Sequence, residues 1–323
     1  FGDMALAYAL RHIETDSPAR LTNYGEYLEE HPPTHEAEVL ENTSWSCAHG
    51  VERWRSDCGC SSGGRPGWNQ AWRAPLREAL DWLRDTLAPK YEDMAGRLLK
   101  DPWAARDDYI GVVLDRSAPS LEGFMARHAA GPLDSSQRVA CLKLLEMQRH
   151  AMLMFTSCGW FFSDLSGIET VQVIQYAARA VQLAEEVSGE VLEPRFLQLL
   201  EPARSNIPEH GTGRQVYEKL VRPAMLDLTS VAAHYAVSSL FEDYSPQAQI
   251  YSYIVDRQDY HTALSGRAKL AVGRATVTSQ LTQETAVLTF SALHLGDHNV
   301  SAGVRGYQGE SVYRAMAQEM TQA

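Results

Sequence analysis

The chain has 323 residues, with 29 Lys and Arg against 41 Asp and Glu and a formal net charge of −12. This acidic balance argues against binding to nucleic acid, which needs a basic face for its phosphates, and against an anionic membrane surface. A neutral ligand such as a sugar is compatible with it, and the 45% of apolar residues is enough for a sizeable core.

The compartment is predicted from what the chain lacks. No run of about 18 apolar residues occurs, so no membrane span is predicted, and no secretory signal pattern opens the chain. Five cysteines, an odd number, disfavour a secreted disulfide scaffold and favour a reducing cytoplasm. The chain opens at Phe1 within a helical pattern, so we expect it to be part of a longer polypeptide.

Apolar residues recur at helical spacing through residues 1–243, which predicts a mainly α, bundle-like helical domain. The strongest pattern covers residues 74–99, where Leu76, Leu80 and Leu83 share one face. Further helices are predicted at residues 1–14, 23–30, 34–41, 101–115, 119–130, 135–157, 169–187, 191–204 and 213–241.

The apolar pattern changes to a period of two after Asp243, which is typical of strands with one buried face. Strands are expected around residues 251–255, 270–277, 288–292 and 300–307, followed by a helix at 311–320. A second domain, residues 244–323, is therefore predicted to be a small antiparallel β unit with a terminal helix.

Residues 42–73 differ in composition from the rest of the chain. They hold four of the seven tryptophans and three of the five cysteines, together with a Gly-rich loop. Indole rings stack on the apolar faces of sugars, while Arg, Asp, Asn and His bond their hydroxyls, so the cluster predicts a carbohydrate pocket. For any single residue, the alternative is that the indole fills core and the arginine pairs with a nearby acid.

The same segment admits a metal site as an alternative. Cys47, His49, Cys58 and Cys60 supply four ligands that suit zinc or an iron–sulfur cluster. Common zinc modules place two or more residues between paired ligands, whereas here each pair is separated by one. The other interpretation is that these are reduced thiols or turn residues.

Residues 156–164 form a second aromatic stretch, for which two interpretations stand. Gly159 is either a helix C-cap followed by a hydrophobic clamp, or part of the aromatic wall of a pocket.

No nucleophile elbow, dinucleotide fingerprint or His-Glu-x-x-His motif occurs, so no catalytic residue and no cofactor is predicted.

The run ENTSWSCAHGVERWR at residues 41–55 resembles the post-barrel region of one bacterial branch of the family 57 glycoside hydrolases. Members of this branch are described as α-amylase/α-mannosidase-like, and this region as a domain of unknown function. Four further stretches are similar: residues 1–8, 67–73, 157–162 and 287–298.

The resemblance implies an N-terminal incomplete (β/α) barrel and a helical region that closes over its mouth. The family is retaining, with a Glu nucleophile and an Asp acid/base in the barrel, and retention needs two carboxyls about 5 Å apart. Both would lie upstream of Phe1. A Cys- and His-containing motif of the family reaches the sugar, so Trp45, Cys47 and His49 are implied contacts, and Trp160 and Phe161 resemble an aromatic motif near the pocket.

The predicted function is the helical part of a retaining α-glycan hydrolase or transferase, partnered by the barrel of the same polypeptide and inactive without it. The expected sugar contacts are Trp45, Cys47, His49, Arg53, Trp54, Arg55, Asp57, Trp68, Trp160 and Phe161. The alternatives are a non-catalytic module that binds glycan or protein, and a metal or iron–sulfur protein that uses Cys47, His49, Cys58 and Cys60.

Overall fold

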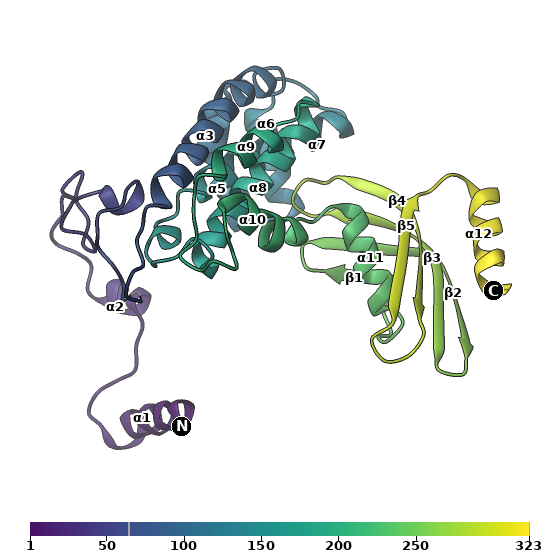
Figure 1. Cartoon of the computed structure of the whole chain (residues 1–323), viewed down its shortest axis with the longest axis horizontal. Coiled ribbons are helices and arrows are strands. Elements are labelled where there is room, and N and C mark those ends of the chain that lie inside the picture. Colours follow the sequence, from purple (N-terminus) through teal and green to yellow (C-terminus); the bar gives the residue numbers. More distant parts are fainter. Residues whose placement is uncertain (64, 323) are drawn as a thin grey trace. The chain divides into compact units, whose positions relative to one another are not determined.

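The computed structural model describes residues 1–63 and 65–322, which divide into two compact units, Phe1–Ala48 and His49–Ala323 (Figure 1). The smaller unit contains α1 (Gly2–Asp16) and α2 (Tyr24–Glu30), and neither helix buries a residue. Asn23 caps α2 by accepting the Glu26 N–H at 3.0 Å. Residues 36–40 have no regular secondary structure, so the helix predicted at 34–41 is absent.

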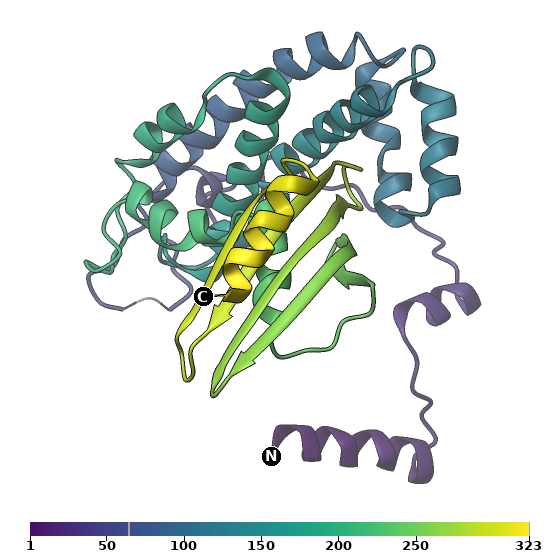
Figure 2. The ribbon, with the colours of Figure 1, turned by 90° about the vertical axis from the view of Figure 1, so that its right-hand side faces the viewer.

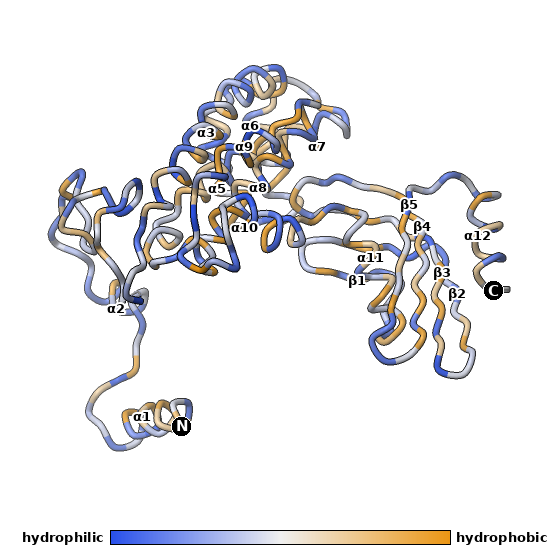
Figure 3. The backbone as a smooth tube through the Cα atoms, in the orientation of Figure 1, coloured by the Kyte–Doolittle hydropathy of each residue, from blue (hydrophilic) through white to orange (hydrophobic). Residues whose placement is uncertain are grey.

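The larger unit begins with helices that surround one hydrophobic core. The leucines predicted on one face of the first long helix are buried there, including Leu76, Leu80 and Leu83. Figure 3 shows hydrophobic residues concentrated along α7 to α9. The helices are α3 (Arg73–Ala95), α4 (Pro102–Asp108), α5 (Ile110–Leu114), α6 (Ala118–His128), α7 (Ser135–Leu153), α8 (Ile168–Ser188), α9 (Glu193–Leu200) and α10 (Gly213–Val216). The next helix, α11 (Leu228–Ser238), packs with the sheet instead.

Local sequence signals explain where several of these helices start and stop. Asp134 and Gln137 form a reciprocal capping box at the start of α7. Gly189 ends α8 in the left-handed conformation that glycine adopts without strain, with φ of 73°. The single helix predicted at 213–241 is broken into α10, a π turn (Tyr217–Val221), a 3-10 turn (Arg222–Ala224) and α11. Pro223 lies in this break, and proline has no N–H to continue a helix.

The C-terminal part is an antiparallel sheet with strands in sequential order β1-β2-β3-β4-β5. In β3 the side chains alternate between the two faces: Val277 joins the cluster that packs against α11, whereas Arg274 lies over Tyr313 of the last helix. Figure 2 shows that helix, α12, lying over one face of the sheet and running along the strands. The bounds are β1 (Gln247–Ile250), β2 (Tyr253–Ser265), β3 (Ala268–Ser279), β4 (Thr285–His294), β5 (Val300–Gly306) and α12 (Glu310–Gln322).

The predicted combination of helices and a C-terminal antiparallel unit is found, although strands form 16% of the chain beside 49% helix, more than a mainly α class implies. The hydrophobic cluster of the sheet includes Leu228 and Tyr235 of α11. It therefore begins before residue 244, where the second domain was predicted to start. Among the helices described, none has the length and apolar character required to cross a bilayer.

Candidate functional site in the tryptophan–cysteine segment and its surroundings

The tryptophan–cysteine segment, residues 42–72, has little regular structure beyond a 3-10 turn at Glu52–Trp54. Its C-terminal half is fixed by side-chain hydrogen bonds to its backbone. The Asp57 carboxylate accepts the Gln70 N–H at 3.2 Å. The Asn206 side chain accepts the Asn69 N–H at 3.0 Å and donates to the Asn69 carbonyl at 2.9 Å. The Asn206 bonds hold Asn69 against the loop before α10, and the Asp57 bond closes the segment on itself.

Two buried arginines join this region to the aromatic stretch at 157–163. Arg53, only 4% exposed, donates from Nη1 to the Phe161 carbonyl at 2.9 Å and lies over the Phe161 ring. Arg73, at the start of α3, donates to the Phe162 carbonyl at 3.4 Å and lies over Trp72. Arg53 was expected to bond sugar hydroxyls, but its burial and these contacts give it a role in holding the segment together.

Trp160 is also placed differently from the expectation. It is 1% exposed and stacks on Trp72 with ring centroids 6.3 Å apart. The Trp72 indole N–H donates to the Ser163 carbonyl at 3.3 Å. Because both rings belong to the helical core, Trp160 presents no face to a ligand in this structure.

The remaining expected contacts are spread over different environments. Trp45, in the smaller unit, is 90% exposed. Trp54 is partly buried and packs on the helical core, and Phe161 is half-buried under Arg53. Arg55 is exposed and paired with Glu52.

Trp68 lines a shallow groove of about 500 Å³, named here the Trp68 groove. The groove combines aromatic faces, carboxylates, an imidazole and hydroxyls, contributed by the segment, the 162–169 stretch and the loop before α10. Its principal side chains are Trp68, Phe162, Asp164, Glu169, Ile207 and His210. Sequence reasoning identified Trp68 but missed the acidic and imidazole groups, which come from two other stretches, residues 162–169 and the loop before α10.

Asp164 is the most strongly fixed polar group of the Trp68 groove. Burial opposes its ionisation, but hydrogen bonds from Ser166, Asn206 and Ser205 outweigh this and hold the pKa of Asp164 below its ordinary value. The donors are the Ser166 N–H at 2.8 Å, the Ser166 hydroxyl at 2.6 Å, the Ser205 hydroxyl at 2.9 Å and the Asn206 N–H at 2.6 Å. An ionised carboxylate held by so many donors shapes the groove and is a poor proton donor.

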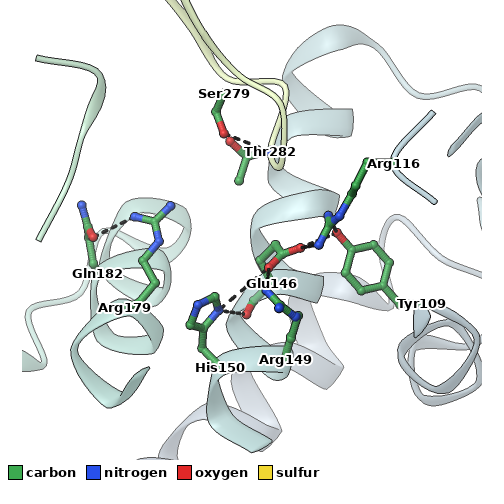
Figure 4. Close-up of polar contacts among 9 residues, drawn as sticks. All are labelled: Tyr109, Arg116, Glu146, Arg149, His150, Arg179, Gln182, Ser279 and Thr282. Carbon is green, nitrogen blue, oxygen red and sulfur yellow. Dashed lines mark hydrogen bonds and ion pairs between the residues drawn. The ribbon is translucent and has the colours of Figure 1, made fainter. Parts of the chain in front are cut away.

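A buried ionic network occupies the middle of α7 (Figure 4). Glu146 accepts hydrogen bonds from the Tyr109 hydroxyl at 2.7 Å and from Arg149 at 3.1 Å, and Arg116 pairs with it at 2.7 Å. His150 Nδ1 donates to the Glu146 carbonyl at 2.8 Å. Burial lowers the pKa of His150 despite this bond.

His150 also lines a second pocket, of about 260 Å³, where α8 faces the start of the sheet. Tyr176 and Arg179 of α8 lie on one side of this pocket, and Tyr251 and Tyr253 lie on the other. The pocket combines polar, aromatic and aliphatic side chains, but its lining contains no carboxylate among the described residues. It therefore offers recognition groups without an acid–base pair.

The four possible metal ligands of the sequence gather in space. The ligand atoms of Cys47, His49, Cys58 and Cys60 all lie within 4.8 Å of one another. Cys60 Sγ and His49 Nδ1 are 3.5 Å apart, and Arg73 Nη1 donates to Cys58 Sγ at 3.8 Å. No disulfide joins any of the five cysteines, all of which lie in the described part of the chain.

These observations define a helical domain that leads into a five-stranded antiparallel meander, with the Trp- and Cys-rich residues 49–72 packed at its start. Residues 68–323 match the profile of a family described as a domain of unknown function (DUF3536), and the chain belongs to that family. No curated protein and no solved structure matches the chain. The match includes most of the Trp68 groove and begins after the four clustered ligands.

Proposed function

We propose that this chain is the carbohydrate-contacting helical part of an enzyme that acts on α-glycans, and that the glycan lies in the Trp68 groove. One observation carries the proposal. Two of the stretches that resemble family 57 glycoside hydrolases, residues 67–73 and 157–162, lie together, and each places an aromatic ring, Trp68 or Phe162, in the groove wall.

The lining of the groove suits a sugar. An indole face packs against the apolar face of a pyranose ring, while carboxylate, imidazole and hydroxyl groups bond its hydroxyls. Trp68 is half-buried, so its ring is held in place and still accessible. Glu169 and His210 are the polar groups positioned to bond hydroxyls. A shallow groove also accommodates a polymer that continues beyond it.

The same lining is not equipped for glycoside hydrolysis by itself. A retaining mechanism needs two carboxyl groups about 5 Å apart, one of them able to donate a proton. Asp164 is committed to its hydrogen bonds from Ser166, Ser205 and Asn206. The catalytic carboxylates are therefore proposed to come from a barrel on the same polypeptide, and the chain studied alone should show no glycosidase turnover.

Maltooligosaccharide binding tests the proposal. We expect weak binding, with a dissociation constant of about 1 mM, detected by saturation-transfer NMR and titration calorimetry. Trp68→Ala should abolish it and Glu169→Gln should weaken it, because both remove groove contacts. Tyr251→Ala, which removes an exposed ring from the second pocket, is the matched control and should bind like the wild type.

Three outcomes are informative. Absence of binding at about 10 mM oligosaccharide, or loss of binding in Tyr251→Ala alone, contradicts the assignment to the Trp68 groove. Micromolar affinity instead supports the second candidate, a self-sufficient glycan-binding module, which the commitment of Asp164 to its hydrogen bonds also favours. Turnover of maltooligosaccharides by this chain contradicts the absence of catalytic carboxylates.

A further inference from the structure

We propose that Cys47, His49, Cys58 and Cys60 bind one zinc ion, which fixes the tryptophan–cysteine segment in place. This proposal goes beyond the carbohydrate function and does not depend on it. Three of the ligands, His49, Cys58 and Cys60, belong to the larger unit, and Cys47 is joined to His49 through Ala48 alone. The ligand set is three thiolates and one imidazole, a combination common in structural zinc sites.

The distances are close to those of a tetrahedral site. Zinc–sulfur bonds of about 2.3 Å and zinc–nitrogen bonds of about 2.0 Å place neighbouring ligand atoms about 3.6–3.8 Å apart. The Cys60 Sγ to His49 Nδ1 separation is 3.5 Å, and no pair among the four ligand atoms exceeds 4.8 Å. The cluster therefore needs to contract by only about 1 Å at its widest pair to surround an ion.

The backbone explains how ligands one residue apart can converge. Gly59, between Cys58 and Cys60, has φ of 76°, and Gly50, directly after His49, has φ of 67°. Left-handed conformations of this kind turn the chain sharply and are largely restricted to glycine. The one-residue spacing, which differs from that of common zinc modules, is thus accompanied by a turn within the Cys58–Cys60 pair and by a second turn directly after the Cys47–His49 pair.

The charge of the surroundings also favours a bound zinc–thiolate group. Arg73 is fully buried, and it makes no ion pair with a carboxylate within the described residues. Its Nε lacks a hydrogen-bond partner, while Nη1 donates to Cys58 Sγ. Three thiolates and a zinc ion carry a net charge of about −1, which would balance the buried guanidinium.

A metal would add to the hydrogen bonds that already fix the C-terminal half of this segment. Through residues 42–69 only Cys47 and Arg53 are buried among the residues described, and regular structure is limited to one 3-10 turn. A loop of this length is rarely ordered by its own packing. Zinc binding contributes folding free energy directly to such segments.

The experiment measures metal in the chain purified anaerobically without chelators. Elemental analysis should find about one zinc per chain, and replacement by Co²⁺ should give the visible spectrum of tetrahedral thiolate coordination. Cys58→Ser and His49→Ala should each lose most of the zinc. Cys158→Ser, which removes an exposed cysteine outside the cluster, should keep it.

A second measurement keeps the proposal testable if the variants fail to fold. In it, the wild-type chain alone competes for zinc against a chromogenic chelator. Reduced apo protein should take up one zinc with nanomolar or tighter affinity, and mercurial modification of its thiols should release it. Iron with acid-labile sulfide, a disulfide among these cysteines in the anaerobic protein, or zinc uptake no tighter than micromolar would each overturn the proposal.

Discussion

The Glu146 side chain is only 2% exposed, and it stays ionised because Arg116, Tyr109 and Arg149 all direct donors at it. Burial alone would raise the pKa of Glu146, but the Arg116 charge and the Tyr109 hydrogen bond hold it below its ordinary value of 4.5. A buried carboxylate of this kind is costly to disturb, because its removal leaves buried donors and cations without their partner.

Glu146→Gln is therefore expected to lower the free energy of unfolding by about 3 kcal/mol at pH 7, measured by urea denaturation. The folded-state pKa is below the unfolded value of 4.5, so the stabilising contribution is complete above pH 4.5 and is lost as the pH falls through the folded-state pKa. The difference between wild type and variant should shrink in that acidic range.

Glu122→Gln is the matched control for this prediction. Glu122 also pairs with an arginine, Arg138, but its side chain is 63% exposed. Screening by water makes such surface pairs weak, so this variant should unfold almost like the wild type. Equal losses in the two variants would show that burial is not what makes Glu146 important.

Individual site residues were only partly predictable. The Trp- and Arg-rich composition pointed to Trp68, which does line a groove, but composition does not tell an exposed indole from a buried one, and Trp160 is in the core. Asp164 and His210 were missed because they reach the groove from segments more than 40 residues apart. Only the fold brings such residues together.

At the scale of elements, the close approach of the 3-10 turn at Ser157–Trp160 to α8 sets the position of the aromatic stretch. A Cβ on Gly159 would lie 2.3 Å from Val173 Cγ2 and 3.3 Å from the Glu169 carbonyl oxygen. The Thr170 hydroxyl donates to the Gly159 carbonyl at 2.7 Å. Close packing against α8 therefore requires glycine at position 159. This role differs from both interpretations drawn from the sequence, a helix C-cap and a part of a pocket wall.

Gly159→Ala should therefore lower the free energy of unfolding by about 1–3 kcal/mol, because Val173 and the α8 backbone must move to admit the methyl group. Gly131→Ala is the control, since a Cβ at that position meets nothing within 4 Å. Chemical denaturation of both variants measures the difference. A Gly159→Ala protein as stable as Gly131→Ala would contradict this account.

Elements with long apolar faces were the most predictable. The pattern at 74–99 became α3, and that at 135–157 became α7, each ending a few residues early. The prediction at 213–241 was wrong in its continuity, because Pro223 outweighed the apolar spacing on both sides of it. The short pattern at 34–41 had too few apolar residues to form a stable helix.

At the scale of the larger unit, two hydrophobic clusters meet across a charged contact. Lys143 of α7, 7% exposed, pairs with Glu186 of α8 at 2.9 Å and with Glu284 of the β3–β4 turn at 2.8 Å. One ammonium group thus links the helical core to the sheet. The two clusters are otherwise formed by separate sets of buried residues.

Lys143→Ala should uncouple the two clusters in thermal unfolding. All seven tryptophans occur at or before residue 160, so their fluorescence reports on the part of the chain that precedes the sheet, whereas far-ultraviolet circular dichroism reports on the helices and the sheet. The variant should lose sheet signal before tryptophan signal, and the wild type should lose them together. Lys100→Ala removes an exposed lysine within the helical part and should behave like the wild type. Coincident curves for Lys143→Ala would contradict the link.

The contact between Arg73 and Cys58 has a practical consequence for anyone who expresses this domain. A gene truncated at the start of the family match, residue 68, would keep the buried guanidinium and discard the sulfur that accepts its hydrogen bond. It would also discard Arg53, which donates a hydrogen bond to the Phe161 carbonyl, and Asp57, which accepts one from the Gln70 N–H. The contacts of the helical part thus extend upstream of the family match, so an expressed domain should include Arg53, Asp57 and Cys58.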